Sequence, residues 1–180
     1  MATTKLLGIS GSLRNDSHNT LLLAEAARLF GDTDYNLADI NLPLYNGDDE
    51  EAHGVPAAVD ALAQQIADAD AVMISTPEYN KGPSGALKNA LDWVSRSSVK
   101  PWENKPVAVM SAAAGRAGGE RAQMILRAFM VPFRPRILQG PEIHVAASYE
   151  AFDDNGQLTG EMYLKDLEAL MKALHAEIGR

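Results

Sequence analysis

The sequence contains no cysteine among its 180 residues. Disulfide bonds, thiolate metal sites and cysteine nucleophiles are therefore excluded, and the absence fits the reducing cytoplasm. No apolar run approaches the roughly 18 residues that a membrane-spanning helix needs. The segment Met1–Lys5 leads into an apolar stretch without the pattern of a signal peptide. We therefore expect a cytoplasmic protein that does not bind membranes.

Positive charge is also scarce. The 16 lysine and arginine residues are outnumbered by 24 acidic ones, which leaves a net charge of −8. This balance argues against nucleic acid or an anionic membrane as a partner. A phosphate ligand must then be held by local donors, against the overall field. Internal repeats and low-complexity segments are absent, and the length predicts a single domain over residues 1–180.

Short apolar runs alternate with helical segments along the chain. The predicted strands are Lys5–Ser10, Tyr35–Ile40, Ala71–Ser75, Pro106–Ser111 and a fifth split between Ile137–Leu138 and Ile143–Val145. The predicted helices are Ser17–Phe30, a second after Pro56, Ser84–Ser97, Glu120–Met130 and Met162–Ile178. Helix-length crossovers predict an α/β fold, a doubly wound five-stranded parallel sheet in the order 2-1-3-4-5 with helices on both faces. The acidic segment Asn41–Val55 is predicted to be a loop, and its role is open.

Three loops are predicted to meet at the carboxyl edge of this sheet, near the point where the strand order reverses. They are Ser10–Asn19, Thr76–Gly82 and Ser111–Gly119. The first loop is rich in hydroxyl groups, carries Arg14 and precedes a helix, which is a geometry that binds phosphate. The alternative is an ordinary turn with good helix caps.

The other two loops have room for the rest of a ligand. Prolines stiffen the second loop, so its exposed amides could bond a planar polar ring on which Tyr79 packs. The third loop is nearly free of bulky side chains, which leaves space at the end of its strand. For each loop, a plain turn remains the alternative.

Two motifs make the pattern more specific. The first is Gly8-Ile9-Ser10-Gly11-Ser12-Leu13-Arg14, followed by Ser17 and Asn19, and the second is Pro77-Glu78-Tyr79-Asn80, followed by Pro83-Ser84-Gly85-Ala86-Leu87-Lys88-Asn89. Together they resemble the phosphate loop and the isoalloxazine loop of the NAD(P)H-dependent FMN reductase family. That family is flavodoxin-like and includes quinone, chromate and azo-dye reductases. The similarity extends from Lys5 to about Val145.

The resemblance implies bound FMN as cofactor, NAD(P)H as electron donor and a small-molecule acceptor. The implied cofactor-binding residues are Ser10, Ser12, Leu13, Arg14, Ser17, Asn19 and Thr20 in the phosphate loop, Pro77, Glu78, Tyr79 and Asn80 at the ring, and Ser111 and Gly115 in the third loop. The expected reaction is ping-pong hydride transfer, with the chemistry carried by FMN and no catalytic side chain or metal. Quinone, chromate, azo dye, ferric chelate and free flavin remain open as acceptors, as does the choice between NADH and NADPH.

Family resemblance also predicts a homodimer or homotetramer. The helix that begins at Ser84 is the candidate interface, with Trp93 and Trp102 near its end.

Other functional classes fit the sequence less well. The first loop lacks the third glycine of a dinucleotide-binding G-x-G-x-x-G motif, and the chain has no Gly-Lys-Ser/Thr element of a P-loop NTPase. No G-x-S-x-G elbow and no metal-ligand spacing indicate a hydrolase. A non-catalytic flavodoxin-type electron carrier remains the alternative function.

Overall fold

The computed structural model of the chain describes residues 3–180. Met1 and Ala2, which belong to the segment expected to lack a signal peptide, lie outside the described residues. The strands are β1 (Thr4–Ser10), β2 (Thr33–Ala38), β3 (Ala71–Thr76), β4 (Pro106–Ala112), β5 (Arg136–Ile137) and β6 (Ile143–Val145). The α-helices are α1 (His18–Phe30), α2 (Gly47–His53), α3 (Ala57–Asp68), α4 (Gly85–Val94), α5 (Glu120–Met130) and α6 (Glu161–Glu177), with a 3-10 turn η1 at Val131–Phe133.

All strand pairs are parallel, and the order is β2-β1-β3-β4-β5, as predicted. The fifth position is shared by two short strands. β5 pairs with the start of β4, and β6 pairs with its end. The split fifth strand that the sequence predicted is therefore confirmed. Because every strand points the same way, all of the loops that follow strands lie at one edge of the sheet.

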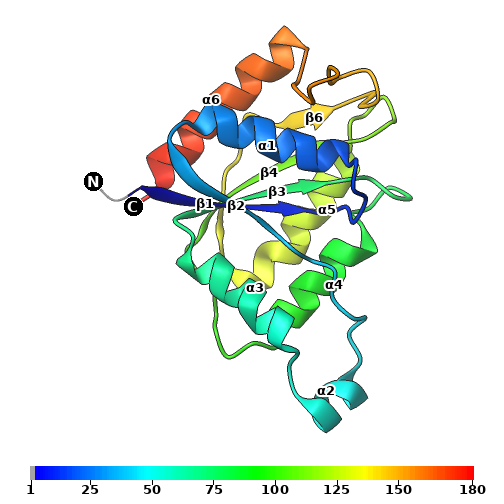
Figure 1. Cartoon of the computed structure of the whole chain (residues 1–180), viewed down its shortest axis with the longest axis vertical. Helices are drawn as coiled ribbons and strands as arrows, with labels where there is room; N and C mark the ends of the chain where they lie inside the picture. The colour runs from blue at the N-terminus through cyan, green and yellow to red at the C-terminus, as the bar shows by residue number, and fades with distance from the viewer. Residues whose placement is uncertain (1–2) are drawn as a thin grey trace.

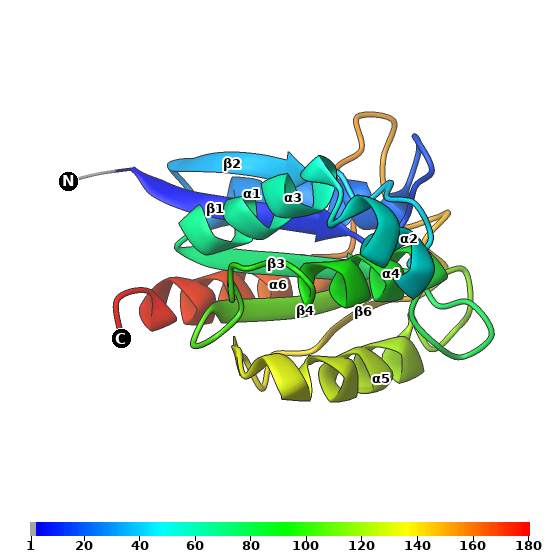
Figure 2. The same ribbon diagram turned by 90° about the horizontal axis from the view of Figure 1, so that it is seen from below.

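Helices cover both faces of the sheet, with α1 and α6 on one face and α3, α4 and α5 on the other (Figure 1, Figure 2). Each face has its own apolar core, and Met73 and Ile74 on neighbouring positions of β3 belong to different cores. β3 and β4 are buried along their whole length, which explains their continuous apolar runs. Within residues 3–180, no helix is long and apolar enough to cross a membrane.

Gly8 in β1 makes room for a tyrosine from the neighbouring edge strand. A Cβ atom added at Gly8 would lie 2.6 Å from the hydroxyl oxygen of Tyr35 in β2. Burial raises the pKa of the Tyr35 phenol to about 12, from an ordinary value of about 10. The neutral phenol is therefore the form that the native state holds.

This burial predicts a loss of stability in alkali. The unfolded chain releases the Tyr35 proton from about pH 10, whereas the folded chain keeps it to about pH 12. The free energy of unfolding should therefore be unaffected by Tyr35 below about pH 10 and should fall by about 1–2 kcal/mol above it, after allowance for partial exposure. Urea unfolding of Tyr35→Phe should show a smaller alkaline loss than the native chain. The exposed Tyr149→Phe is the control, and equal alkaline slopes for Tyr35→Phe and the native chain would contradict the prediction.

The prediction of an irregular loop over Asn41–Val55 is wrong in part. α2 lies within this segment, capped by the Asn46 side chain, which accepts a 3.0 Å hydrogen bond from the Asp48 backbone. An Asn cap before three acidic residues is a helix-start signal in the sequence. Arg96 holds the helix by donating to both carboxylate oxygens of Glu50 at 2.9 Å. This hydrogen bonding lowers the pKa of Glu50.

The helix that begins at Ser84 stays a predicted subunit interface, but the two tryptophans near its end do not belong to its exposed surface. Trp93 and Trp102 are each only 2% exposed. The Trp93 indole donates a 2.7 Å hydrogen bond to the Pro43 carbonyl and packs edge-on against Tyr45. Trp102 belongs to the apolar core beneath α4. Both rings are large apolar groups that the fold itself buries, so they are not available to a partner subunit.

Candidate functional site

The three loops converge at the carboxyl edge of the sheet around a cavity of about 370 Å³. Each loop contributes to the lining: Ser12, Arg14, Asp16, Ser17, His18 and Asn19 from the first, Pro77, Glu78 and Tyr79 from the second, and Ala112, Ala113 and Ala114 from the third. The sequence predicted that these loops lie at one edge of the sheet, and in the structure they surround one cavity. Cavities of this size hold small ligands.

The first loop carries the donors that an anion needs. Within residues 3–180, the backbone N–H groups of the four residues 15–18 donate to no protein acceptor. They precede or begin α1, where the helix dipole favours negative charge. Arg14 is exposed beside them, and the Ser12 hydroxyl also lines the cavity. This donor set fits the phosphate of the FMN that the family resemblance implies.

The second loop is tied to the first by Ser84. Its hydroxyl donates to the Gly11 carbonyl and accepts a 3.1 Å bond from the Leu87 backbone, so it also caps α4. The Gly11 N–H donates to the Ser75 carbonyl at 2.7 Å. These bonds set the distance between the phosphate loop and the loop that carries Tyr79. The sequence placed Ser84 in the second motif, but its cross-loop contact depends on tertiary structure.

The end of the second loop is a tight two-residue turn. Tyr79 and Gly82 exchange two backbone hydrogen bonds, of 2.9 and 3.1 Å. Asn80 and Lys81 between them have φ of 50° and 69°, as the turn requires. Tyr79 is 53% exposed, and Glu78 accepts a 3.1 Å bond from the Ala122 backbone. The loop is therefore rigid, with its tyrosine exposed.

The Asn19 side chain links neighbouring elements at the carboxyl edge of the sheet through buried hydrogen bonds. Its side-chain oxygen accepts from the Ser75 hydroxyl at 2.8 Å and from the Ala112 backbone at 3.0 Å. Its amide nitrogen donates to the Ala112 carbonyl at 2.9 Å. Asn19 is 4% exposed. The side chain thus joins α1 to β3 and β4, and its polar atoms are used in these bonds rather than presented to a ligand.

The Ser111 side chain likewise forms buried hydrogen bonds, which hold the third loop. Its hydroxyl donates to the Gly118 carbonyl at 2.6 Å and accepts from the Gln123 amide at 2.8 Å. Gly118 has φ of +60°, and a Cβ atom there would collide with the carbonyl of His144. Ser111 is fully buried, so its side chain shapes the loop and does not border the cavity.

The remaining predicted residues lie either in a neighbouring groove or on exposed parts of their loops. Ser10, Leu13 and Thr20 line a neighbouring groove of about 400 Å³, which shares Ser12 and Arg14 with the cavity. Ser10 and Thr20 bond each other through their hydroxyls at 2.9 Å. Asn80 and Gly115 are exposed on their loops and are outside both linings.

Two residues that follow β6, Ser148 and Tyr149, complete the cavity. The His18 ring bonds the Ser148 hydroxyl at 3.0 Å and stacks on Phe152, with ring centroids 5.6 Å apart. Tyr149 is 64% exposed. Sequence reasoning missed these residues because nothing in their local pattern indicates a ligand. Only the return of the chain after β6 brings them to the first loop.

Loss of the Ser84 hydroxyl should loosen both loops. In Ser84→Ala the Leu87 N–H and the Gly11 carbonyl each lose a partner, and the expected loss in the free energy of unfolding is about 1–2 kcal/mol. Urea denaturation measures this loss. Ser95→Ala is a matched control, because among the described residues the Ser95 hydroxyl bonds only to the Asp92 carbonyl at the end of its own helix. Equal stability for the two variants would contradict a cross-loop role.

Comparison with known proteins agrees with this geometry. Residues 4–150 match the family described as NADPH-dependent FMN reductase. An NAD(P)H-dependent FMN reductase of Pseudomonas aeruginosa is 42% identical over 178 residues, which are 98% of this chain and 96% of the relative. A quinone reductase of Escherichia coli K12 is 40% identical over 143 residues, 77% of this chain and 75% of the relative. Among solved structures, the NAD(P)H:acceptor oxidoreductase FerB of Paracoccus denitrificans has a TM-score of 0.86 at 33% identity, covering 98% of this chain and 97% of that one.

Proposed function

The chain belongs to the NADPH-dependent FMN reductase family, and on that premise we propose that it reduces quinones. It is an NAD(P)H-dependent flavoenzyme with FMN as its cofactor. When bound, FMN supplies the two-electron chemistry between the nicotinamide and the acceptor. The tasks left to the protein are to bind and orient the cofactor and to admit a donor and an acceptor.

The first loop would hold the FMN phosphate. Arg14, the Ser12 hydroxyl and the N–H groups of residues 15–18 supply charge-assisted and neutral hydrogen bonds at the start of α1. Ser84 and Asn19 are positioning residues for this cradle, since each ties it to another element. The backbone of Pro77–Asn80 would border the isoalloxazine ring. Ala112, Ala113 and Ala114 would leave space for the rest of the cofactor because they carry no bulk.

The observation that favours a quinone is the pair of tyrosines at the cavity. Tyr79 and Tyr149 both line it and are 53% and 64% exposed. Flat aromatic acceptors pack well against exposed aromatic rings. The names of relatives support the same acceptor class, since the Escherichia coli relative is a quinone reductase.

A steady-state assay tests this function. FMN-loaded protein is mixed with NADH or NADPH and either benzoquinone or chromate, and nicotinamide absorbance is followed. We expect sustained turnover with benzoquinone and parallel double-reciprocal lines, which indicate a ping-pong sequence. Faster turnover with chromate would overturn the quinone assignment. Absence of turnover without a partner protein, in FMN-loaded enzyme, would favour an electron carrier instead.

A further inference from the structure

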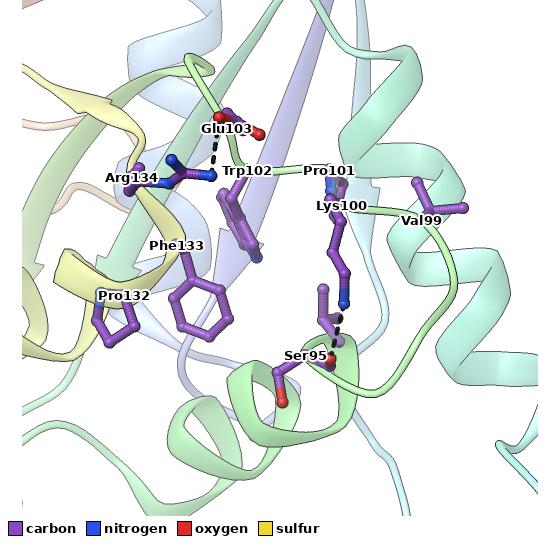
Figure 3. Close-up of a pocket in the computed structure, with 10 residues that line it drawn as sticks. Ser95, Val99, Lys100, Pro101, Trp102, Glu103, Pro132, Phe133 and Arg134 are labelled. Atoms are coloured by element: carbon purple, nitrogen blue, oxygen red, sulfur yellow. Dashed lines mark hydrogen bonds and ion pairs between the residues drawn. The ribbon is translucent and has the colours of Figure 1, made fainter.

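A second cavity lies at the opposite edge of the sheet. Its volume is about 500 Å³, and it is bordered by the end of α4, the connection from α4 to β4, and η1 (Figure 3). β4 and β5 begin at this edge, at Pro106 and Arg136, whereas the loops of the candidate FMN site follow the ends of strands. The two cavities share no lining residue.

The walls of this distal cavity are mainly apolar. They include Val94, Val99, Pro101, Pro132 and Phe133. Walls of this kind, in a space of this size, are typical of small-molecule sites, where a few polar groups fix the orientation of the ligand.

Trp102 supplies a polar group without a partner. The residue is 2% exposed, and its indole nitrogen is buried with no hydrogen-bond partner among the described residues. Figure 3 shows that nitrogen at the end of the ring that points between Phe133 and Lys100. Trp93 differs, because its indole nitrogen donates to the Pro43 carbonyl at 2.7 Å. A buried N–H without an acceptor is costly, so an acceptor atom placed in this cavity would gain a bond that the protein alone does not make.

The charges at the cavity favour an anion. Arg134 pairs with Glu103 at 2.9 Å, so these two charges offset each other. Lys100 has only a long bond of 3.4 Å to the Ser95 carbonyl and is exposed. Lys100 lines the same cavity as Trp102, and in the view of Figure 3 the nitrogen of each side chain lies toward Ser95. The cavity therefore carries a local positive charge in a chain whose net charge is −8.

We propose that the distal cavity binds a small aromatic carboxylate, with the ring between Phe133 and the apolar walls and the carboxylate accepting from Trp102 and Lys100. This site goes beyond the proposed reductase function and is independent of it. Two donors that line one apolar space match one anionic group on a flat apolar body.

The indole resonances of the chain provide a direct test, because the sequence has only two tryptophans. The FMN-loaded, nitrogen-labelled protein is titrated with naphthoate, and the two indole N–H signals are followed by NMR and assigned with Trp102→Phe. We expect a saturable shift of the Trp102 signal and little change in the Trp93 signal. Naphthamide, the neutral analogue, should bind about tenfold more weakly because its oxygen carries no negative charge to pair with the Lys100 ammonium group.

A lysine variant tests the charge without disturbing the core. Lys100→Met should weaken naphthoate about tenfold, weaken naphthamide less, and leave FMN content and quinone turnover unchanged. Lys165→Met, an exposed lysine on α6, should bind naphthoate like the native chain. The proposal is overturned if the Trp102 signal does not saturate, if both indole signals move together, or if Lys100→Met and Lys165→Met bind naphthoate equally. A Trp102 signal that depends on protein concentration alone would overturn it in favour of contact between copies of the chain.

Discussion

Replacement of Asn19 by alanine is expected to lower the free energy of unfolding by about 3–5 kcal/mol. The substitution removes three buried hydrogen bonds that link α1 to Ser75 and Ala112. Both backbone polar groups of Ala112 lose these bonds, each at a cost of about 1–3 kcal/mol. Urea denaturation of flavin-free protein measures the effect without a contribution from cofactor binding.

Asn15→Ala is the matched control for this prediction. Asn15 lies in the same loop, is exposed, and its side chain forms no hydrogen bond with the described residues. Its removal should change the stability by no more than about 0.5 kcal/mol. A loss below about 1 kcal/mol in Asn19→Ala would show that water or local rearrangement replaces the three bonds. Asn19 would then not be the residue that joins the loops.

Arg14→Ala is expected to weaken FMN binding by about 10–100-fold while the fold stays intact. The reason is the loss of a charge-assisted bond to the phosphate, worth about 1.5–3 kcal/mol. Arg14 is exposed, so its truncation leaves no buried group unpaired. Flavin fluorescence titration of the flavin-free protein gives the dissociation constant, and circular dichroism reports the fold.

Two controls separate phosphate binding from a general loss of charge. Riboflavin lacks the phosphate, so its affinity should be the same for Arg14→Ala and the native chain. Arg134→Ala removes an exposed arginine at the opposite sheet edge and should leave FMN affinity unchanged. If Arg14→Ala weakens riboflavin and FMN equally, Arg14 acts on the flavin ring or the loop rather than on the phosphate.

Much of the fold was predictable because burial leaves a simple pattern in parallel strands. β3 and β4 have helices on both faces, so every side chain along them is apolar or small, as in Ala71–Thr76. Predictions were weaker where a segment is exposed. β2 at the sheet edge begins two residues earlier than expected, at Thr33, and α2 buries none of its residues. With little apolar surface to bury, such segments carry little periodicity.

The candidate site was also predictable only in part. The sequence predicted three loops that follow strands at one edge, with hydroxyl groups and Arg14 ahead of a helix, because strand direction and loop composition are local properties. Tertiary structure alone decided which polar side chains are already paired. Asn19 bonds to Ala112, which is 93 residues away in the sequence, and His18 bonds to Ser148, which is 130 residues away. Hydrogen bonds between such distant residues depend on packing, so only the folded chain separates the residues that hold the loops from those that face the ligand.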